Sequence, residues 1–483
     1  MKNVYLLRRI NQTKETKRSG VRLSQQRLCV GCLSFRIGKA VRVIGPRADV
    51  PDSPFVAFDT GVGIRGYTAN KFTYKIEGPN LESLRLNTTI PVIGAGSAGN
   101  FDECGAWLIG VDKQGARIHG WYHAEEKCNY SIEQTHKSVA YAYSEDWGLT
   151  FIKPNYPNNN VLSAAENSVQ GRTTGQGDQT VIKFGKYYLM YFLDNETYRT
   201  GVARSPISNC GLPGSWSKWH KGLFTEPGIR GKFTPLGLLG TSSSLYRDPS
   251  SNQAYVALIG VDKWFGGFKM SLSSDGINFE QVQDPLLYVP QEEWVRDSNK
   301  GELLIYPSVV APDANSSWRN SFYLFYTYLQ PGEDFSNRYL IRRKVEVSSP
   351  GKLTSPQVKV ELSSYYSTRR GRHWVTTTMV PDEYTFEKRV GYVFTSFKRG
   401  MQELQECYRP ARDQHVVGIS CSGIQNSKKL RTLGWIWAEQ RAGTVPLYSC
   451  YKDSTEDHFV SALHKCENYQ ARTEFTLGYV LSQ

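Results

Sequence analysis

Four acidic side chains lie within three residues of a glycine, just before or at the start of short apolar runs. They are Asp59, Asp102, Asp178 and Glu302. Glycine has no Cβ, so the backbone around such a carboxylate can come close to a ligand. Two carboxyl groups in different surroundings can divide acid–base work, because one stays protonated and donates while the other stays ionised. These residues are therefore the first candidates for a chemical site.

A further acidic candidate lies in the aromatic segment 121–126. If this segment is a strand, alternation places His123 and Glu125 on the same face. Glu125 can then donate a proton while Asp102 or Asp178 acts as base or nucleophile. His123 would tune Glu125 or hold a water molecule or an ion. The candidate catalytic residues are Asp102, Asp178 and Glu125, and the candidate substrate-binding residues are His123, Asp59, Trp121, Glu302 and Tyr306.

The elements that would hold these side chains follow a regular rhythm from residue 100 to residue 347. An apolar strand, a Tyr-rich strand and a strand ending in Ser or Arg recur every 50 to 65 residues or so, as in the four-stranded blades of a propeller. Residues 41–95 leave room for one further blade. The pattern predicts an all-β fold with a five-bladed β-propeller over residues 41–347.

Two tight turns support this prediction. Residues 144–151 read Ser-Glu-Asp-Trp-Gly-Leu-Thr-Phe, and residues 273–279 form a shorter relative. In such a turn Asp146 accepts backbone N–H bonds, Gly148 supplies a positive φ, and Phe151 fills the space inside the blade. These turns indicate the fold and not the site.

A propeller also explains how distant carboxylates could meet. The innermost strands of all blades run parallel around one axis, so their starting ends ring one mouth of the central channel. Acidic residues at strand starts therefore gather at that mouth. The whole site prediction depends on this convergence.

A threefold repeat fills the C-terminal part of the chain, residues 362–483, after a linker over residues 348–361. His373, His415 and His458 are 42 and 43 residues apart, and the glycines at 391, 434 and 478 are 43 and 44 residues apart. A unit this short cannot bury its own apolar face, so three units should share one core, as in a β-trefoil. We expect the three histidines to be structural, with ligand binding as the alternative.

The basic character of the chain is concentrated at its N-terminus. Residues 1–42 hold eleven Lys and Arg against the single acid Glu15, whereas the rest of the chain holds 47 basic and 44 acidic residues. A nearly neutral body argues against a nucleic-acid-binding face. We expect residues 1–40 to be a basic, disordered arm without an evident secretory signal, and no apolar run is long enough to span a membrane.

The nine cysteines include pairs at positions suited to local disulfides. These pairs are Cys104 and Cys128, Cys407 and Cys421, and Cys450 and Cys466. Such pairs indicate an oxidising compartment and hence a secreted protein. Cys29 and Cys32 form a lone C-x-x-C with no second pair and no clustered His, so we expect neither a zinc site nor a redox site there.

A glycine-rich segment imitates a nucleotide-binding motif. Residues 92–99, Val-Ile-Gly-Ala-Gly-Ser-Ala-Gly, match the G-x-G-x-x-G pattern. That pattern binds dinucleotides only where a helix opens at the third glycine. The sequence continues into a strand-like run without helical periodicity, so we expect a loop entering a blade.

The propeller portion, about 300 residues, resembles the five-bladed β-propeller glycoside hydrolase superfamily of arabinanases, xylosidases and fructosidases, with turns like the Asp boxes of sialidases. The resemblance rests on the blade rhythm, Gly177-Asp178 at a strand start, Tyr306-Pro-Ser308 and the strand 201–205. It implies the roles of base, pKa modulator and acid. Carried over by position, these roles fall on Asp59 or Asp102, on Asp178, and on Glu125 or Glu302, respectively.

The C-terminal part, about 120 residues, resembles a repeat domain of unknown function that is often appended to secreted hydrolases. Residues 447–451, 457–459 and 477–480 carry its motifs Leu-Tyr-Ser-Cys-Tyr, Asp-His-Phe and Leu-Gly-Tyr-Val. This resemblance implies an accessory carbohydrate-binding role.

These observations predict a secreted, monomeric glycoside hydrolase that acts on a poly- or oligosaccharide without a cofactor. The alternative is a non-catalytic glycan-binding or adhesion propeller, in which axial carboxylates accept sugar hydroxyls or hold a calcium ion. A sialidase-like enzyme is a third interpretation, which requires arginines to converge on a substrate carboxylate. The arginines in question are Arg65, Arg172, Arg204, Arg342 and Arg343.

Overall fold

The computed structural model describes residues 28–261, 266–289, 301–315, 317–348, 356–468 and 470–482. Strands dominate these residues, and the helical segments among them are short 3-10 turns such as Val30–Cys32. The predicted all-β class is therefore confirmed. Residues 1–27 of the predicted arm and residues 349–355 of the predicted linker lie outside the described part of the chain.

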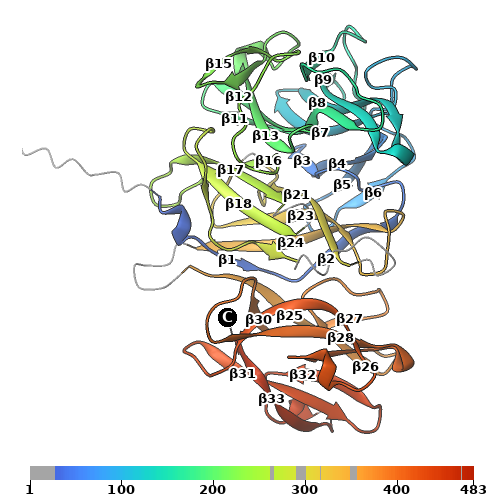
Figure 1. Cartoon of the computed structure of the whole chain (residues 1–483), viewed down its shortest axis with the longest axis vertical. Coiled ribbons are helices and arrows are strands. Elements are labelled where there is room, and N and C mark those ends of the chain that lie inside the picture. Colours follow the sequence, from blue (N-terminus) through green and yellow to red (C-terminus); the bar gives the residue numbers. More distant parts are fainter. Residues whose placement is uncertain are drawn as a thin grey trace, which may run out of the picture.

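Across the described residues from 56 to 348, the strands form five successive antiparallel groups (Figure 1). The first two groups are β3 (Val56–Asp59), β4 (Ile64–Asn70), β5 (Phe72–Gly78) and β6 (Arg85–Asn87), then β7 (Gly105–Gln114), β8 (Arg117–Asn129), β9 (Gln134–Ser144) and β10 (Asn160–Ser163). The third group is β11 (Thr173–Phe184), β12 (Tyr187–Asp194), β13 (Arg199–Pro206), β14 (Ser217–His220) and β15 (Leu223–Pro227). The fourth group is β16 (Ser242–Arg247), β17 (Ala254–Val261), β18 (Gly267–Ser273), β19 (Glu280–Gln281) and β20 (Leu287–Tyr288). The fifth group is β21 (Leu303–Val310), β23 (Ser321–Leu329) and β24 (Arg338–Ser348), and a short strand β22 (Ser317–Trp318) pairs with β16.

The first strands of these groups contact one another in a closed ring. β3 contacts β7, β7 contacts β11, β11 contacts β16, β16 contacts β21, and β21 contacts β3 again. β11 also pairs in parallel with β9, where Gly175 faces Lys137. The ring therefore brings residues from distant parts of the sequence to one place.

Side chains of β8 alternate between two different cores. Tyr122 and Ala124 pack with residues of the first group, whereas Trp121 packs with Tyr188 and Trp216 of the third group. Alternation follows from the pleat of a strand, which points successive side chains to opposite faces. The same alternation decides which functional candidates can meet.

β1 (Ser34–Ile37) corrects the predicted N-terminal boundary. It pairs antiparallel with β24 and parallel with β25 (Val358–Ser367). Phe35 and Ile37 are buried in the core. This stretch is therefore an ordered strand and not part of a disordered arm, because its apolar side chains are covered and its backbone is paired on both edges. Since β25 begins at Val358, the predicted linker is also too long at its C-terminal end.

β2 (Val41–Arg47) pairs with the other half of β24 and adds a strand to the fifth group. The last group is thus completed by the N-terminal part of the chain.

Three similar three-stranded units follow (Figure 1). They are β25, β26 (Arg372–Thr376) and β27 (Thr385–Phe394); β28 (Met401–Arg409), β29 (Gln414–Gly418) and β30 (Lys428–Trp437); and β31 (Thr444–Lys452), β32 (Asp457–Ser461) and β33 (Arg472–Leu481). At one end the strands β27, β30 and β33 pair with each other. The short strands β26, β29 and β32 also contact each other. The three units therefore enclose a common interior.

The predicted turn at residues 144–151 has the expected structure. The Thr150 N–H donates to Asp146 Oδ1 at 2.9 Å, and the Gly148 N–H donates to Ser144 Oγ at 2.7 Å. Gly148 has a φ of 83°, and Phe151 is buried.

The described residues contain four disulfides, among them the three predicted pairs. The fourth joins Cys29 to Cys32, a pairing that the sequence analysis did not predict. Cys210 is free in the described part of the chain.

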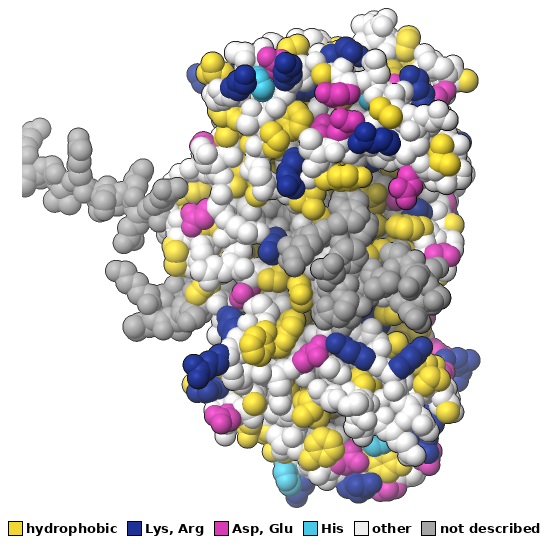
Figure 2. All heavy atoms as spheres, viewed as in Figure 1, with side chains coloured by type: hydrophobic (Ala, Val, Ile, Leu, Met, Phe, Trp, Pro, Cys, Tyr) yellow, Lys and Arg dark blue, Asp and Glu magenta, His cyan; other side chains and the backbone are white. Residues whose placement is uncertain are grey.

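Acidic and basic side chains are interspersed on the face drawn in Figure 2, in keeping with the nearly neutral composition after residue 42. Within the described ranges, no helix combines the length and the apolarity that a membrane span would need.

Candidate functional site

Asp178 lies in the middle of β11 and not at a strand start as expected, where the register with β12 shifts between Gly177 and Thr180. Its φ is 49°, a conformation in which the short polar side chain of Asp is tolerated. Its Oδ2 accepts a bond from Lys137 Nζ on β9 at 3.0 Å. Its backbone N–H donates to His123 Nδ1 on β8 at 2.9 Å. Three strands from two groups therefore fix the position of this carboxylate.

His123 and Glu125 share one face of β8, as predicted. His123 Nε2 lies 3.0 Å from Glu125 Oε1. Since His123 Nδ1 accepts the Asp178 N–H, its proton belongs on Nε2, from which it donates to Glu125. Tyr130 donates its hydroxyl to Glu125 Oε2 at 2.6 Å. Glu125 is therefore a buried, fully bonded carboxylate that holds its neighbours in place.

The two predicted carboxylates are brought together. Lys137 Nζ lies 3.9 Å from Glu125 Oε1 and 3.0 Å from Asp178 Oδ2, so these two oxygens are at most about 7 Å apart. The structure thus brings Asp178, Glu125 and His123 together.

Asp52 is an acidic neighbour that the sequence analysis missed. It lies in the Pro51-Asp-Ser-Pro54 segment ahead of β3, and its Oδ1 is 3.6 Å from Arg338 Nη2 of β24. The charges of Glu125, Lys137 and Asp178 all act on it. The sequence feature that could have indicated Asp52 is its position between two prolines shortly before the first strand of a group.

The surroundings raise the pKa of Asp52 and lower the pKa values of Asp178 and Glu125. Burial raises the pKa of Asp52, and Glu125 and Asp178 add to the rise against the opposing charge of Arg338. Burial also acts to raise the pKa of Asp178, but the charge and hydrogen bond of Lys137 outweigh it and hold this pKa below its ordinary value. Glu125 is also buried, yet its bonds to His123 and the Lys137 charge lower its pKa to about 2.

A pocket of about 290 Å³ opens beside Asp178. Lys137, Tyr306 and Thr241 contribute to its wall, and Tyr198 and Phe335 are exposed aromatic side chains at its edge. Burial and the neighbouring carboxylates raise the pKa of Tyr306, so its hydroxyl stays protonated and can donate. Tyr306, predicted to bind substrate, therefore lines the pocket beside Asp178.

Asp102 does not join this cluster. It is completely buried and bonds to Tyr122, Lys153 and Tyr156. Tyr122 faces away from Glu125 on β8, so Asp102 and Glu125 lie on opposite sides of that strand. Its prediction as a catalytic residue was wrong, because its position before a first strand says nothing about which face it joins.

The glycine-rich loop owes its shape to Asp102. A Cβ at Gly96 would overlap Asp102 Oδ1 and the Tyr156 hydroxyl. The Gly96 N–H also donates to the Asp102 carbonyl at 2.9 Å. As predicted, residues 94–104 contain no helix, and β7 begins at Gly105.

Three substrate-binding predictions were also wrong. Asp59 ends β3 and accepts the Gly61 N–H in an exposed turn at 2.7 Å. Glu302 is buried and bonds to Arg431 Nη1 of β30 at 2.9 Å. Trp121 is fully buried and donates Nε1–H to the Gly211 carbonyl at 3.0 Å. Each of these side chains meets a local partner away from Asp178.

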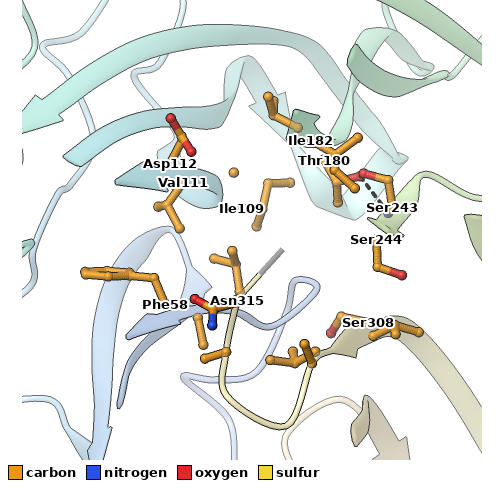
Figure 3. Close-up of a pocket in the computed structure, with 18 of the residues that line it drawn as sticks. Phe58, Ile109, Val111, Asp112, Thr180, Ile182, Ser243, Ser244, Ser308 and Asn315 are labelled. Atoms are coloured by element: carbon orange, nitrogen blue, oxygen red, sulfur yellow. Dashed lines mark hydrogen bonds between the residues drawn. The ribbon is translucent and has the colours of Figure 1, made fainter. Parts of the chain in front are cut away.

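Asp59 belongs instead to a second hollow, of about 390 Å³ (Figure 3). Its wall holds the later parts of the first strands, including Val111, Thr180, Ile182 and Ser308. The two hollows thus open at different ends of the ring.

The arginines required for a sialidase-like site do not converge. Arg65 bonds to Glu77, Arg204 lies over the rings of Tyr187 and Phe224, and Arg342 and Arg343 are consecutive residues of β24 that bond to different partners. The structure therefore does not support a sialidase-like site.

The repeated histidines pair with carboxylates inside their own domain. His373 Nδ1 lies 2.5 Å from Asp457, His415 Nδ1 lies 2.8 Å from Glu406, and His458 Nδ1 lies 3.4 Å from Glu474. These contacts fit the structural role that the sequence analysis favoured.

Among the described residues, no group of three or more His, Cys, Asp or Glu side chains is arranged to hold a metal ion.

No family model and no curated protein sequence matches this chain. Among solved structures, it is similar to a thermostable family-43 glycoside hydrolase with 13% identity and a TM-score of 0.38, over 65% of this chain and 97% of the other. It is also similar to a family 117 glycoside hydrolase from the marine bacterium Zobellia galactanivorans, with 10% identity and a TM-score of 0.46, over 66% and 91%. An alpha-L-arabinofuranosidase from Lactobacillus brevis has 10% identity and a TM-score of 0.39, over 71% and 97%. Likeness at this level does not establish an activity, so the function has to come from the site.

Proposed function

We propose that the chain is a glycoside hydrolase built on a five-bladed β-propeller, with a threefold, trefoil-like accessory domain. The closed ring of β3, β7, β11, β16 and β21 supports the blade interpretation. Each of these strands begins an antiparallel group, as the innermost strand of a propeller blade does.

One observation carries the hydrolase proposal: Asp52, Glu125 and Asp178 gather at one end of the ring, although 126 residues of sequence separate the first from the last. Glycoside hydrolysis needs one carboxyl group that stays protonated and one that stays ionised. The raised pKa of Asp52 and the lowered pKa of Asp178 meet this requirement.

In this mechanism Asp52 donates a proton to the leaving oxygen. Asp178, kept ionised by Lys137, acts either as the base that takes a proton from a water molecule attacking the sugar carbon, or as the nucleophile that attacks this carbon itself. The pKa of Glu125 is lowered to about 2, so we assign the role of acid to Asp52 and not to Glu125. It acts as a positioning residue through His123, whose ring bonds both to Glu125 and to the Asp178 backbone.

The test is hydrolysis of a panel of aryl glycosides and oligosaccharides by wild type, Asp178→Asn and Asp59→Asn. We expect Asp178→Asn to lose activity by more than about a hundredfold, because an amide replaces the base. Asp59→Asn should keep activity, because Asp59 contributes only to an exposed turn.

Glycan binding measured on the same proteins separates the hydrolase from the lectin-like alternative. Binding without turnover in wild type, unchanged in Asp178→Asn, would favour a non-catalytic glycan-binding propeller. Turnover that Asp178→Asn retains would refute the assignment of Asp178.

We further propose that the protein is secreted and monomeric, that its ligand is a carbohydrate, and that the C-terminal units bind carbohydrate as an accessory domain. The four disulfides support an oxidising compartment.

A further inference from the structure

A single exposed sheet face crosses the boundary between the ring of five groups and the C-terminal units. β1 creates it, because it pairs with β24 on one side and with β25 on the other. In Figure 1, β1 and β2 run along this boundary. Two adjoining hollows of about 750 and 460 Å³ lie over the face and share Arg36, Lys344 and Glu346. We call this feature the β1 groove.

The β1 groove is lined by twice as many basic as acidic residues. The basic residues are Arg36, Lys39, Arg342, Lys344, Lys359 and Arg389, and the acidic residues are Glu82, Glu346 and Glu361. Arg36 and Lys39 come from the basic N-terminal stretch, and the other four basic residues come from β24, β25 and β27.

Two cations stand directly opposite each other in the groove. Arg36 of β1 is the register partner of Lys359 of β25. Like charges in directly opposed positions destabilise a sheet. Glu346, on the other side of Arg36, forms an ion pair with it and offsets part of this cost.

A third cation completes the cluster around one aromatic ring. Arg36 Cζ, Lys359 Nζ and Arg389 Cζ lie 5.9, 5.1 and 5.2 Å from the centre of the Tyr392 ring. Burial and the charges of Arg36 and Arg389 lower the pKa of Lys359. The cluster thus gathers three cationic groups around a single ring, where they would attract an anion.

We propose that the β1 groove binds an anionic polysaccharide through its sulfate or carboxylate groups. The mixed lining favours a polysaccharide over a nucleic acid. Glu346 and Glu361 would repel closely spaced phosphates, but they can accept bonds from the hydroxyl groups that separate the charges of a polysaccharide. The choice of a carbohydrate polymer also rests on the proposed function.

The test compares wild type with the triple variant Lys344→Gln/Lys359→Gln/Arg389→Gln. The matched control is Lys186→Gln/Lys232→Gln/Lys428→Gln, which removes the same charge from exposed positions outside the groove. Binding is measured calorimetrically with dextran sulfate, carboxymethyl dextran, unmodified dextran and a DNA duplex. The first two probes distinguish sulfate from carboxylate recognition.

We expect wild type to bind an anionic dextran more weakly as salt rises, and not to bind unmodified dextran. The triple variant should bind about tenfold more weakly. A factor of ten in affinity corresponds to about 1.4 kcal/mol, and three lost charge contacts together supply about that much. The control should bind like wild type.

Equal binding by the triple variant and the control would overturn the proposal, as would failure of both anionic dextrans to bind wild type. Tighter binding of DNA than of either dextran would overturn the choice of polysaccharide. Melting temperatures establish that the variants are folded, and Lys344→Gln alone, at an exposed position, should weaken binding if the triple variant is unstable. Asp178→Asn should keep groove binding, so a failed hydrolase proposal and a failed groove proposal give different results.

Discussion

At the scale of single residues, the site depends on which of its three carboxyl groups, Asp52, Glu125 and Asp178, is protonated, and neighbouring side chains decide this. The bond from His123 and the charge of Lys137 keep Glu125 ionised, and Lys137 also keeps Asp178 ionised. Asp52 is left with Arg338 as its nearest cation at 3.6 Å, and burial keeps its pKa raised. Identical functional groups thus acquire different roles from their surroundings.

The pH dependence of the rate tests this division. Activity requires Asp178 ionised and Asp52 protonated, so kcat/KM should rise as pH passes the lowered pKa of Asp178 and fall as pH passes the raised pKa of Asp52. Asp52→Asn should lose most of the activity and also the fall on the high-pH side. A variant that keeps this fall would show that another group donates the proton.

At the scale of elements, β8 separates two acidic residues that look equivalent in sequence. Asp102 bonds to Tyr122 on one face, and Glu125 bonds to His123 on the other. The strand period and the segment itself could be predicted from sequence, and so could the meeting of His123 and Glu125. The face of β8 that Asp102 joins could not, because it depends on how the preceding loop folds back against Lys153 and Tyr156.

That loop provides a prediction about Gly96. Gly96→Ala places a methyl group against the buried Asp102 carboxylate and Tyr156. We expect a loss of about 1–3 kcal/mol of unfolding free energy, the usual cost of overpacking, measured by urea denaturation. Gly423→Ala is the control, because nothing lies within 4 Å of its Cβ position. Equal stability of the two variants would contradict the close approach at Gly96.

At the scale of the whole molecule, β1 connects the two parts of the chain. It contributes Phe35 and Ile37 to a core that also contains residues of the fifth group and of the C-terminal units. Arg431 of β30 adds a polar connection by bonding to both Glu302 and the Tyr328 hydroxyl. The two parts should therefore unfold together.

Phe35→Ala tests this coupling. Removing the buried ring, which packs against Phe322, should cost about 3–5 kcal/mol and lower the melting temperature of a single cooperative transition. Phe397→Ala, at a position that is 62% exposed, should change stability by about 0.5 kcal/mol at most. Calorimetry that resolves two separate transitions in Phe35→Ala would show that the parts unfold independently.

The sequence by itself determined the strands, the tight turns, three disulfide pairs and the contact between His123 and Glu125, because each follows from local spacing and the pleat of a strand. Tertiary structure decided which carboxylates share a site. Asp52 meets Asp178 and Glu125 only because the ring closes. Asp102 and Glu302 lie outside this site because they form ion pairs with Lys153 and Arg431, respectively. The electrostatic partners of these carboxylates lie far from them in sequence, so a local sequence pattern cannot predict them.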